Sequence, residues 1–503
     1  MRIKYSLSLL FSLFLCTIHA QPKVNTQNGL VTGYTKDGLH IFKGIPFAAP
    51  PLGPLRWKAP QEPSKWLGDL NCTAFSASPM QRDPKPFACW TEEFIAPPSP
   101  LSEDCLYLNI WTKPNNKKKP VVVWIYGGGF NSGSASCAVY DGKYYAQNDI
   151  VFVSINYRVN IFGFFSHPSL TAESNGKGAA NFGLLDQLQA LKWVQKNIAT
   201  FGGDPSNVAI MGQSAGSFSV HALVASPLAK GLFTKAIAHS GGLMGTNRGV
   251  NLATAEANGT KLADQLGIQT IEELRALPTA DLLEKVNKFN PPYTPVMDNY
   301  FLPLDIKSHY SSGSHNNVKV LTGWVTGDGK LFGNTQIPPD DFKKQLDQNY
   351  PGKKDALLKY FPADNPEMAA HSNAKLRRLS FGAIPAILWA QYNKAPVYIY
   401  EFDHVPVPKP DFPDYGAFHT ADMPFAFHSL DTWNRPWRDS DLQMEKMMSQ
   451  YWINFIKTGN PNGKGLTPWK PYDIKNKSVM ELKLGGKEVK GLFAKEVELI
   501  VGG

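Results

Sequence analysis

Cysteine is scarce in this chain of 503 residues, which has five, one of them Cys16 within the first twenty positions. So few cysteines exclude a small fold held together by disulfide bonds, and the 43% of apolar residues can build a large core instead. The chain also lacks HExxH, CxxC and nucleotide-binding loop motifs, so we predict neither a metal nor an organic cofactor. It has no internal repeat and no low-complexity linker, which is consistent with an ordinary globular enzyme.

A nucleic-acid partner is not predicted either. The formal net charge is +9, and removing the two charges of Arg2 and Lys4 leaves +7 for the rest of the chain. The lysines are scattered, and the single run at 117–119 directly precedes an apolar strand, so we interpret it as a solvated loop. No basic stripe is interleaved with aromatic residues, as nucleic-acid binding would require.

Long hydrophobic runs are also missing beyond the first twenty residues. Within the first twenty residues, Arg2 and Lys4 precede a short apolar run at 7–16, and the small residue Ala20 follows. This pattern is typical of a secretory signal peptide cut after Ala20, because the run is shorter than the roughly 20 residues that span a bilayer. A membrane anchor, or a lipid anchor at Cys16, is the less favoured alternative. We therefore predict a signal peptide at 1–20, a single domain at 21–503, and a secreted or periplasmic protein without an integral membrane segment.

Apolar runs rich in β-branched residues alternate with helical patterns along the chain. Strands are predicted at 121–126, 150–156, 208–211, 318–321 and 397–400, and a helix is predicted at 183–197. The stretch 250–295 is helical in pattern and is expected to cover the sheet rather than to form a separate domain. Such alternation is typical of an α/β protein with a mostly parallel sheet flanked by helices.

The candidate nucleophile is Ser214, within the sequence Gly-Gln-Ser-Ala-Gly at 212–216. The motif follows a predicted strand and precedes an apolar helix at 218–224, which is the context that exposes a serine hydroxyl on a sharp turn. The N–H of Ala215 and those of the glycine-rich loop at 127–130 are the expected donors of an oxyanion hole. A plain structural turn is the alternative for each segment.

The acid and the base should follow Ser214 in that order. Asp328 is the only carboxylate between Asp305 and Asp340, although a turn aspartate between glycines is a serious alternative. Histidines beyond it are His371, His404, His419 and His428. His371 is interpreted as a surface residue and His428 as a core residue. The pattern favours His419 over His404 without deciding between them.

At this point several motifs together resemble the type-B carboxylesterase family, which includes cholinesterases, bile-salt lipases and bacterial para-nitrobenzyl esterases. The resemblance covers nearly the whole chain after residue 20 and implies the α/β-hydrolase fold. That fold has a large, mostly parallel central sheet flanked by helices, a small N-terminal β element and helical insertions covering the site. The motifs are FKGIPFA at 42–48, PLG at 51–53 with Arg56, EDCLYLN at 103–109, GGGF at 127–130, NYR at 156–158, FGGDP at 201–205, YW at 451–452 and TGNP at 458–461.

The resemblance implies a catalytic triad of Ser214, Asp328 and His419, and it favours His419 over His404. Asp328 stands where the family mostly has glutamate, so the charge is kept while the side chain is one methylene shorter. The resemblance also implies an oxyanion hole formed by Gly128, Gly129 and Ala215. It further implies two structural ion pairs, Arg56 with Glu103 and Arg158 with Asp186.

Two departures from the family affect the expectations. Met80 stands where members with an early disulfide have the cysteine that joins Cys105, so we predict a Cys89–Cys105 bond instead, which would leave Cys72 and Cys137 as a second pair or as free thiols. Gln213 stands before the nucleophile, where the family often has glutamate.

The predicted function is hydrolysis of small-molecule carboxylic esters through an acyl-enzyme. Because Gln213 is neutral, we expect neutral esters rather than choline-type esters, even if Trp90 offers an aromatic surface. Alternatives are a serine hydrolase of the same fold that acts on lactones, thioesters or amides, and a non-catalytic adhesion protein. The sequence does not predict the oligomeric state.

Overall fold

The computed structural model describes residues 21–115, 117–245, 249–330, 333–410, 413–432 and 434–502. The predicted signal peptide at 1–20 lies outside these residues. A mixed sheet of eleven strands, in the order β18-β17-β16-β15-β12-β11-β9-β10-β8-β4-β3, forms the centre of the molecule. Its parallel part consists of β10 (Val151–Ile155), β9 (Lys119–Ile125), β11 (Gly203–Gln213), β12 (Lys235–His239), β15 (Lys319–Val325), β16 (Val397–Phe402) and β17 (Ser478–Leu482).

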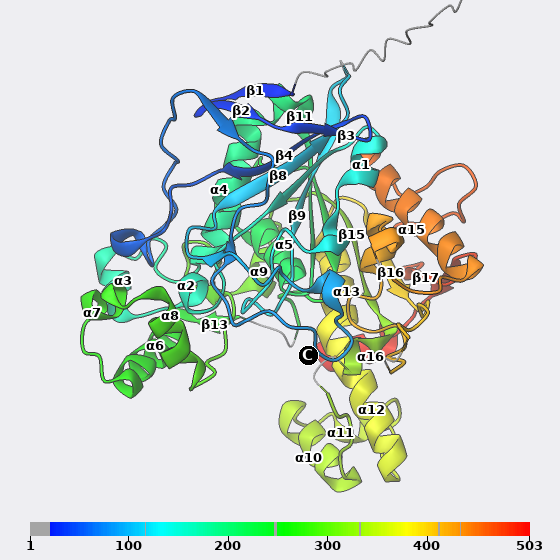
Figure 1. Cartoon of the computed structure of the whole chain (residues 1–503). Coiled ribbons are helices and arrows are strands. Elements are labelled where there is room, and N and C mark those ends of the chain that lie inside the picture. The colour runs from blue at the N-terminus through cyan, green and yellow to red at the C-terminus, as the bar shows by residue number, and fades with distance from the viewer. Residues whose placement is uncertain are drawn as a thin grey trace, which may run out of the picture.

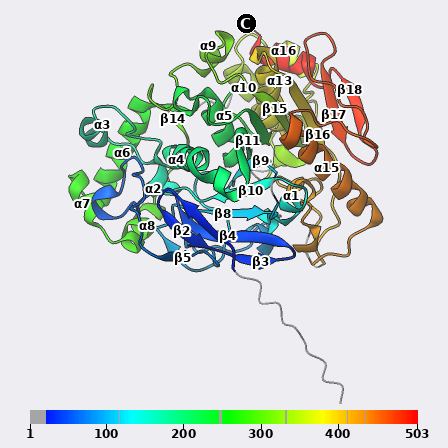
Figure 2. The ribbon, with the colours of Figure 1, turned by 90° about the horizontal axis from the view of Figure 1, so that it is seen from above.

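Antiparallel strands extend the sheet at both edges. They are β8 (Tyr107–Thr112), β4 (Leu39–Pro46) and β3 (Tyr34–Lys36) on one side and β18 (Lys487–Lys490) on the other. A separate three-stranded sheet of β1 (Lys23–Thr26), β2 (Gly29–Thr32) and β5 (Asp69–Asn71) is the small N-terminal β element that the resemblance implied. The three strands of this separate sheet lie together at one end of the molecule (Figures 1 and 2).

The parallel strands are continuous apolar runs because helices and loops cover both of their faces. In β9 and β10, residues 121–125 and 151–155 are all buried. All five strands predicted from the sequence are present, as β9, β10, β11, β15 and β16. Strand β12 was not predicted, because its sequence Lys-Ala-Ile-Ala-His is too short and too weakly β-branched to stand out.

Helices α4 (Phe182–Asn197) and α5 (Ala215–Ala225) pack against β11, and α15 (Asp439–Thr458) packs against β9 and β11. The predicted helix at 183–197 therefore corresponds to α4. Shorter helices complete the layers around the sheet (Figure 2). They are α1 (Lys143–Gln147), α2 (Asn160–Phe164), α9 (Ile306–Ser311), α13 (Ile384–Tyr392), α14 (Met423–Phe427) and α16 (Ala494–Val501). Helix α3 (Pro168–Glu173) instead lies next to the helical group at 252–287 (Figure 1), where Glu173 forms an ion pair with Arg275.

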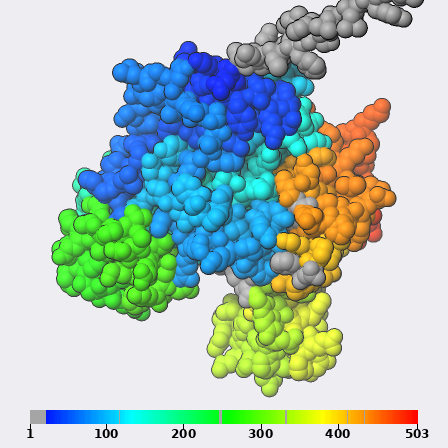
Figure 3. All heavy atoms as spheres, viewed as in Figure 1, coloured from blue at the N-terminus to red at the C-terminus, as the bar shows by residue number. Residues whose placement is uncertain are grey.

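Two groups of helices project from this body. The first comprises α6 (Leu252–Leu266), α7 (Ile271–Ala276) and α8 (Thr279–Asn287), within the stretch predicted to be a helical cover. The second comprises α10 (Pro339–Asn349), α11 (Lys354–Leu358) and α12 (Pro366–Arg378). Both form distinct bulges in the space-filling view, green and yellow-green in Figure 3.

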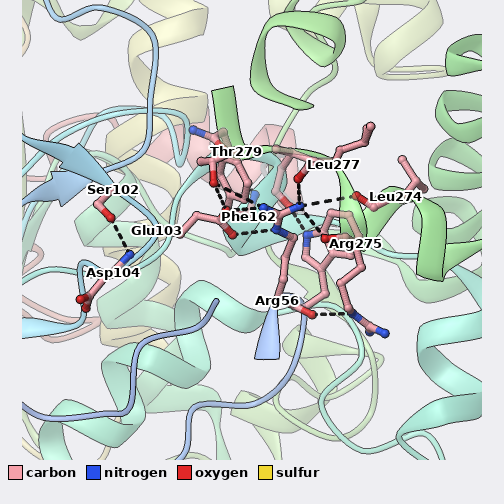
Figure 4. A network of polar contacts seen from close by, with 12 residues as sticks. Arg56, Ser102, Glu103, Asp104, Phe162, Leu274, Arg275, Leu277 and Thr279 are labelled. Carbon is pink, nitrogen blue, oxygen red and sulfur yellow. Dashed lines mark hydrogen bonds and ion pairs between the residues drawn. The ribbon is translucent and has the colours of Figure 1, made fainter. Parts of the chain in front are cut away.

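A buried ion pair ties the first helical group to the N-terminal part of the chain (Figure 4). Arg56 Nη2 lies 2.5 Å from Glu103 Oε1, and both side chains are at most 5% exposed. Arg56 Nη1 also donates to the carbonyls of Arg275 at 2.9 Å and Leu277 at 2.8 Å, at the end of α7. These carbonyls have no partner within the helix, so the guanidinium satisfies them and caps α7.

The second ion pair is also present: Arg158 Nη2 lies 2.6 Å from Asp186 Oδ1 of α4, with both side chains buried. The predicted disulfide bond is wrong, because Cys72, Cys89, Cys105 and Cys137 are all free thiols. Cys105 is fully buried near the Arg158–Asp186 pair, and burial raises the pKa of its thiol well above the usual range.

Cys89 lies in different surroundings, near Arg435, and burial raises the pKa of its thiol to about 12. The residues just before Cys105 are held by backbone hydrogen bonds to the segment at 78–80. The N–H of Ser78 donates to the carbonyl of Pro100 at 2.9 Å, and the N–H of Met80 donates to that of Ser102 at 2.9 Å. Among the helices of the described residues, none is long and apolar enough to cross a membrane.

Candidate active site

Ser214 stands on the sharp turn between β11 and α5, with φ 56° and ψ −121°. Non-glycine residues rarely adopt a positive φ, and such strain is often stored at functional sites. A Cβ on Gly212 would come within 2.3 Å of the Gly216 carbonyl oxygen, and one on Gly216 within 2.0 Å of that of Ile125. Both glycines of the motif are therefore required by close backbone contacts, which is the reason given for them from the sequence.

Asp328 and His419 lie together in the structure. Asp328 follows β15 and is 1% exposed, and His419 lies in the loop between β16 and α14 and is 3% exposed. His419 Nδ1 is 2.6 Å from Asp328 Oδ1, while Asp328 Oδ2 accepts the backbone N–H of Val325 at 3.2 Å. A buried carboxylate on Nδ1 holds the imidazole in the orientation, and with the proton, that a general base needs.

His419 Nε2 is hydrogen-bonded to a side chain other than the serine hydroxyl. Within the described residues, Ser214 Oγ makes no hydrogen bond to His419, and the Gln213 side-chain amide lies 3.0 Å from Nε2 instead. Gln213 is 1% exposed, so this contact is shielded from water. The sequence singled out Gln213 only for its missing charge. Its direct contact with the histidine became visible only once β11 and the His419 loop were placed side by side.

The other histidines occupy different surroundings. His404 Nε2 lies 2.7 Å from Asp441 Oδ1, and Arg438 donates to the same carboxylate at 2.8 and 2.9 Å. His404 is therefore held in a separate buried network. His371 is exposed on α12, as its polar context suggested. His428 is half-buried and stacks on Tyr144 with ring centroids 3.7 Å apart.

A buried network that the sequence did not reveal connects the serine turn to the His419 loop. The backbone N–H of Ser214 donates to the carbonyl of His239, the last residue of β12, at 2.9 Å. The His239 side chain lies 3.0 Å from Asp422 Oδ2, three residues after His419. Trp452 Nε1 donates to His239 Nε2 at 3.0 Å, and the Tyr400 hydroxyl donates to Asp422 at 2.9 Å. Because β12 was not predicted, no sequence signal identified His239.

The glycine-rich loop follows β9 beside Ser214. A Cβ on Gly127 would come within 2.6 Å of the Gln213 carbonyl oxygen, so the loop lies directly against the serine turn. Gly128 has φ 118° and Gly129 φ 61°, both in the region that favours glycine. Within the described residues, the N–H groups of Gly128, Gly129 and Ala215 have no acceptor. This is the condition for backbone donors to bind an oxyanion.

Ser214 and His419 line a cavity of about 1060 Å³. Its walls are largely aromatic, which suits an apolar substrate. The rings of Trp90 and Phe381 meet His419 edge-on, with centroids 6.3 and 5.4 Å from that of the imidazole. The aromatic lining includes Phe87, Trp90, Phe94, Phe130, Phe218 and Phe381.

Comparison with known proteins agrees with this geometry. A sequence profile described as "Carboxylesterase family" matches residues 20–500. The chain belongs to the carboxylesterase family. The para-nitrobenzyl esterase of Bacillus subtilis (strain 168) is 35% identical over 486 residues, covering 91% of this chain and 94% of that protein. A solved structure of a PNB esterase superposes with a TM-score of 0.81 at 30% identity, covering 95% of this chain and 100% of that one.

Other carboxylesterase relatives are named for different esters. The fumonisin B1 esterase of Sphingopyxis macrogoltabida is 33% identical, covering 90% of this chain and 85% of that protein. The human cocaine esterase is also 33% identical, with 90% and 86% covered. The predicted α/β-hydrolase fold, the family and the general activity of a carboxylic-ester hydrolase are therefore confirmed.

Proposed function

We propose that this carboxylesterase hydrolyses neutral carboxylic esters through an acyl-enzyme on Ser214. The observation that carries the assignment is the strained Ser214 turn beside a buried His419–Asp328 pair at the base of an aromatic cavity. His419 accepts the proton of the serine hydroxyl as Oγ attacks the carbonyl carbon, and then returns it to the departing alcohol. Water, activated by the same imidazole, releases the acid.

The oxyanion of each tetrahedral intermediate is held by the N–H groups of Gly128, Gly129 and Ala215. Asp328 keeps the proton on Nδ1 and stabilises the imidazolium that forms at each proton transfer. Before the attack, His419 Nε2 must give up its hydrogen bond with the Gln213 amide and form one with the Ser214 hydroxyl. Catalytic hydrogen bonds often form fully only in the substrate complex, so this exchange is assigned to substrate binding.

The preference for uncharged over cationic esters is supported by the cavity wall. Gln213 is neutral, and Asp83 is the one carboxylate among the described residues of the lining. Asp83 is already paired with Lys85 at 2.9 Å. Trp90 offers a ring face to a cation, but without a free carboxylate nearby a quaternary ammonium group gains little over a neutral group of the same shape.

Export is part of the same proposal. The charged and apolar pattern at 1–20 supports a signal peptide and hence a secreted or periplasmic enzyme. N-terminal sequencing of the protein recovered from its native host tests the cut, and we expect the mature chain to begin at Gln21. A mature chain that begins at Met1 would refute the export.

The experiment that tests the activity is a panel of p-nitrophenyl esters of increasing acyl length, assayed beside a thioester, an anilide and a lactone. We expect the p-nitrophenyl esters to be hydrolysed most efficiently. Ser214→Ala should lower kcat by about 10⁶-fold with the fold intact, as judged by circular dichroism. An organophosphonate should label Ser214 of the wild type. A folded Ser214→Ala enzyme that keeps a tenth of the activity would rule out this mechanism.

A further inference from the structure

The charged side chains at the opening of the cavity are not balanced. The Lys, Arg, Asp and Glu residues of the described lining are Arg82, Asp83 and Lys85, and all three are exposed. Asp83 and Lys85 form an ion pair with each other. Among the described residues, no carboxylate lies within ion-pair distance of Arg82. The cavity opening therefore has one uncompensated charge, and it is positive.

The Arg82 guanidinium is held in place by neutral groups. Its Nη2 donates to the carbonyl of Asn287, the last residue of α8, at 2.9 Å, and to Asn290 Oδ1, just after that helix, at 3.3 Å. Among the described residues, no acceptor binds Nη1 or Nε. Neutral acceptors position the guanidinium without neutralising it, so its remaining N–H groups are available to a carboxylate.

The backbone that carries Arg82 is tied to the segment at 131–133, which directly follows the glycine-rich loop at 127–130. The preceding residue, Gln81, is 3% exposed, donates through Nε2 to the Gly133 carbonyl at 2.9 Å, and accepts the Gly133 N–H at 2.9 Å. Asn160 Nδ2 donates to the carbonyls of Met80 at 2.8 Å and Asn131 at 3.3 Å, which links the same two segments. The backbone on which Arg82 stands is therefore anchored to the segment next to the proposed oxyanion donors.

Arg82 also reaches over the cavity wall. It lies close enough to Tyr293, another lining residue, for its charge to oppose the effect of burial, which raises the pKa of that phenol. The net charge of +9 for the chain, of which Arg2 and Lys4 contribute two, has the same sign and would attract anions toward the surface.

From these observations we propose that Arg82 binds a carboxylate at the distal end of the substrate, so that the enzyme prefers hemiesters of dicarboxylic acids to uncharged esters of the same length. The inference rests on the proposed ester hydrolysis and extends its substrates from neutral esters to esters with an anionic tail. The aromatic wall binds the methylene chain, and Arg82 binds the carboxylate where the chain emerges.

The test compares kcat/KM for p-nitrophenyl hemiesters of adipic, suberic, sebacic and dodecanedioic acids with that for the matched esters ending in a carboxamide. At one length or more, we expect the carboxylate to be preferred by about fivefold, which is typical of a partly exposed ion pair. The preference should fall when the ionic strength is raised from about 0.05 to 0.5 M, because salt screens an exposed charge.

Arg82→Gln should bring the ratio of the two kcat/KM values to about one. Lys85→Gln, which removes a cation from the same opening and leaves Asp83 without its partner, should lower the ratio much less than Arg82→Gln does, because Lys85 does not bind the carboxylate of the substrate. A wild-type ratio of one or less at every length, or a preference that survives in Arg82→Gln, would overturn the inference. If the carboxamide esters are hydrolysed normally in that case, the proposed esterase function still holds. If no ester is hydrolysed and Ser214 is not labelled, both fail.

Discussion

Replacing Asp328 with asparagine tests how the structure sets the protonation of His419. Asp328 uses both carboxylate oxygens: Oδ1 lies 2.6 Å from His419 Nδ1, and Oδ2 accepts the backbone N–H of Val325 at 3.2 Å. An asparagine in the same position must keep its oxygen on the Val325 N–H, since otherwise two donors would face each other in a buried site. Its NH₂ group would then point at Nδ1.

An NH₂ group facing Nδ1 turns that nitrogen into an acceptor, so the imidazole proton moves to Nε2. In that tautomer, His419 cannot accept the proton of Ser214. The same substitution in another serine hydrolase triad lowers kcat by about 10⁴-fold, and this corresponds to about 5.4 kcal/mol of transition-state stabilisation. We expect a loss of this size here, because the Val325 N–H fixes the orientation of the amide.

The assay is kcat for p-nitrophenyl butyrate at saturating substrate, normalised to the concentration of folded protein. Circular dichroism and the melting temperature verify the fold. Asp328→Glu is the matched control, because it keeps the negative charge and introduces glutamate, the residue that most family members have at this position. We expect it to retain far more activity than the asparagine variant. A folded Asp328→Asn enzyme within tenfold of wild-type kcat would show that the acid lies elsewhere.

Three further predictions follow from the site and its surroundings. His419→Ala should abolish activity as Ser214→Ala does, whereas His404→Ala should change stability more than kcat. The reverse result in steady-state assays would show that His404 is the general base. Butyrylcholine should have a kcat/KM within about tenfold of that of its uncharged 3,3-dimethylbutyl analogue, and a larger preference would reveal an anionic subsite. Burial raises the pKa of Glu445 from 4.5 to about 7, so ionising it costs native-state stability as the pH rises through that range. Glu445→Gln should therefore match the wild type in melting temperature below pH 4.5 and exceed it by about 2 °C at pH 8, and an equal or lower value at pH 8 would contradict this.

Much of the site could be predicted because its parts depend on local backbone chemistry. The glycines around Ser214 are needed wherever a strand turns sharply into a helix, and the close contacts at Gly212 and Gly216 show that need directly. The buried strands β9, β10, β15 and β16 were recognisable for a similar reason. A strand covered on both faces must be apolar throughout, and that leaves a continuous pattern in the sequence.

Predictions that depended on how distant segments pack were less successful. The Cys89–Cys105 bond was inferred from a short separation along the chain, yet folding places the two thiols in different surroundings and holds the residues just before Cys105 through backbone hydrogen bonds. The short strand β12 was missed, and with it His239. Its link to Asp422 is a contact between residues more than 180 positions apart, which no local pattern encodes.

The sequence by itself determined the fold class and the family, and it led to Ser214 as the proposed nucleophile with the proposed acid and base after it, because those features are set by backbone geometry and by local hydrophobic pattern. Only the tertiary structure decided which atoms meet. Folding brought the Gln213 amide, rather than the Ser214 hydroxyl, within hydrogen-bond distance of His419 Nε2. It placed His404 in a separate network with Asp441. At the opening of the cavity, it left Arg82 without an ion-pair partner among the described carboxylates. These contacts join segments that are remote in the chain, and their geometry depends on the packing of whole strands and helices.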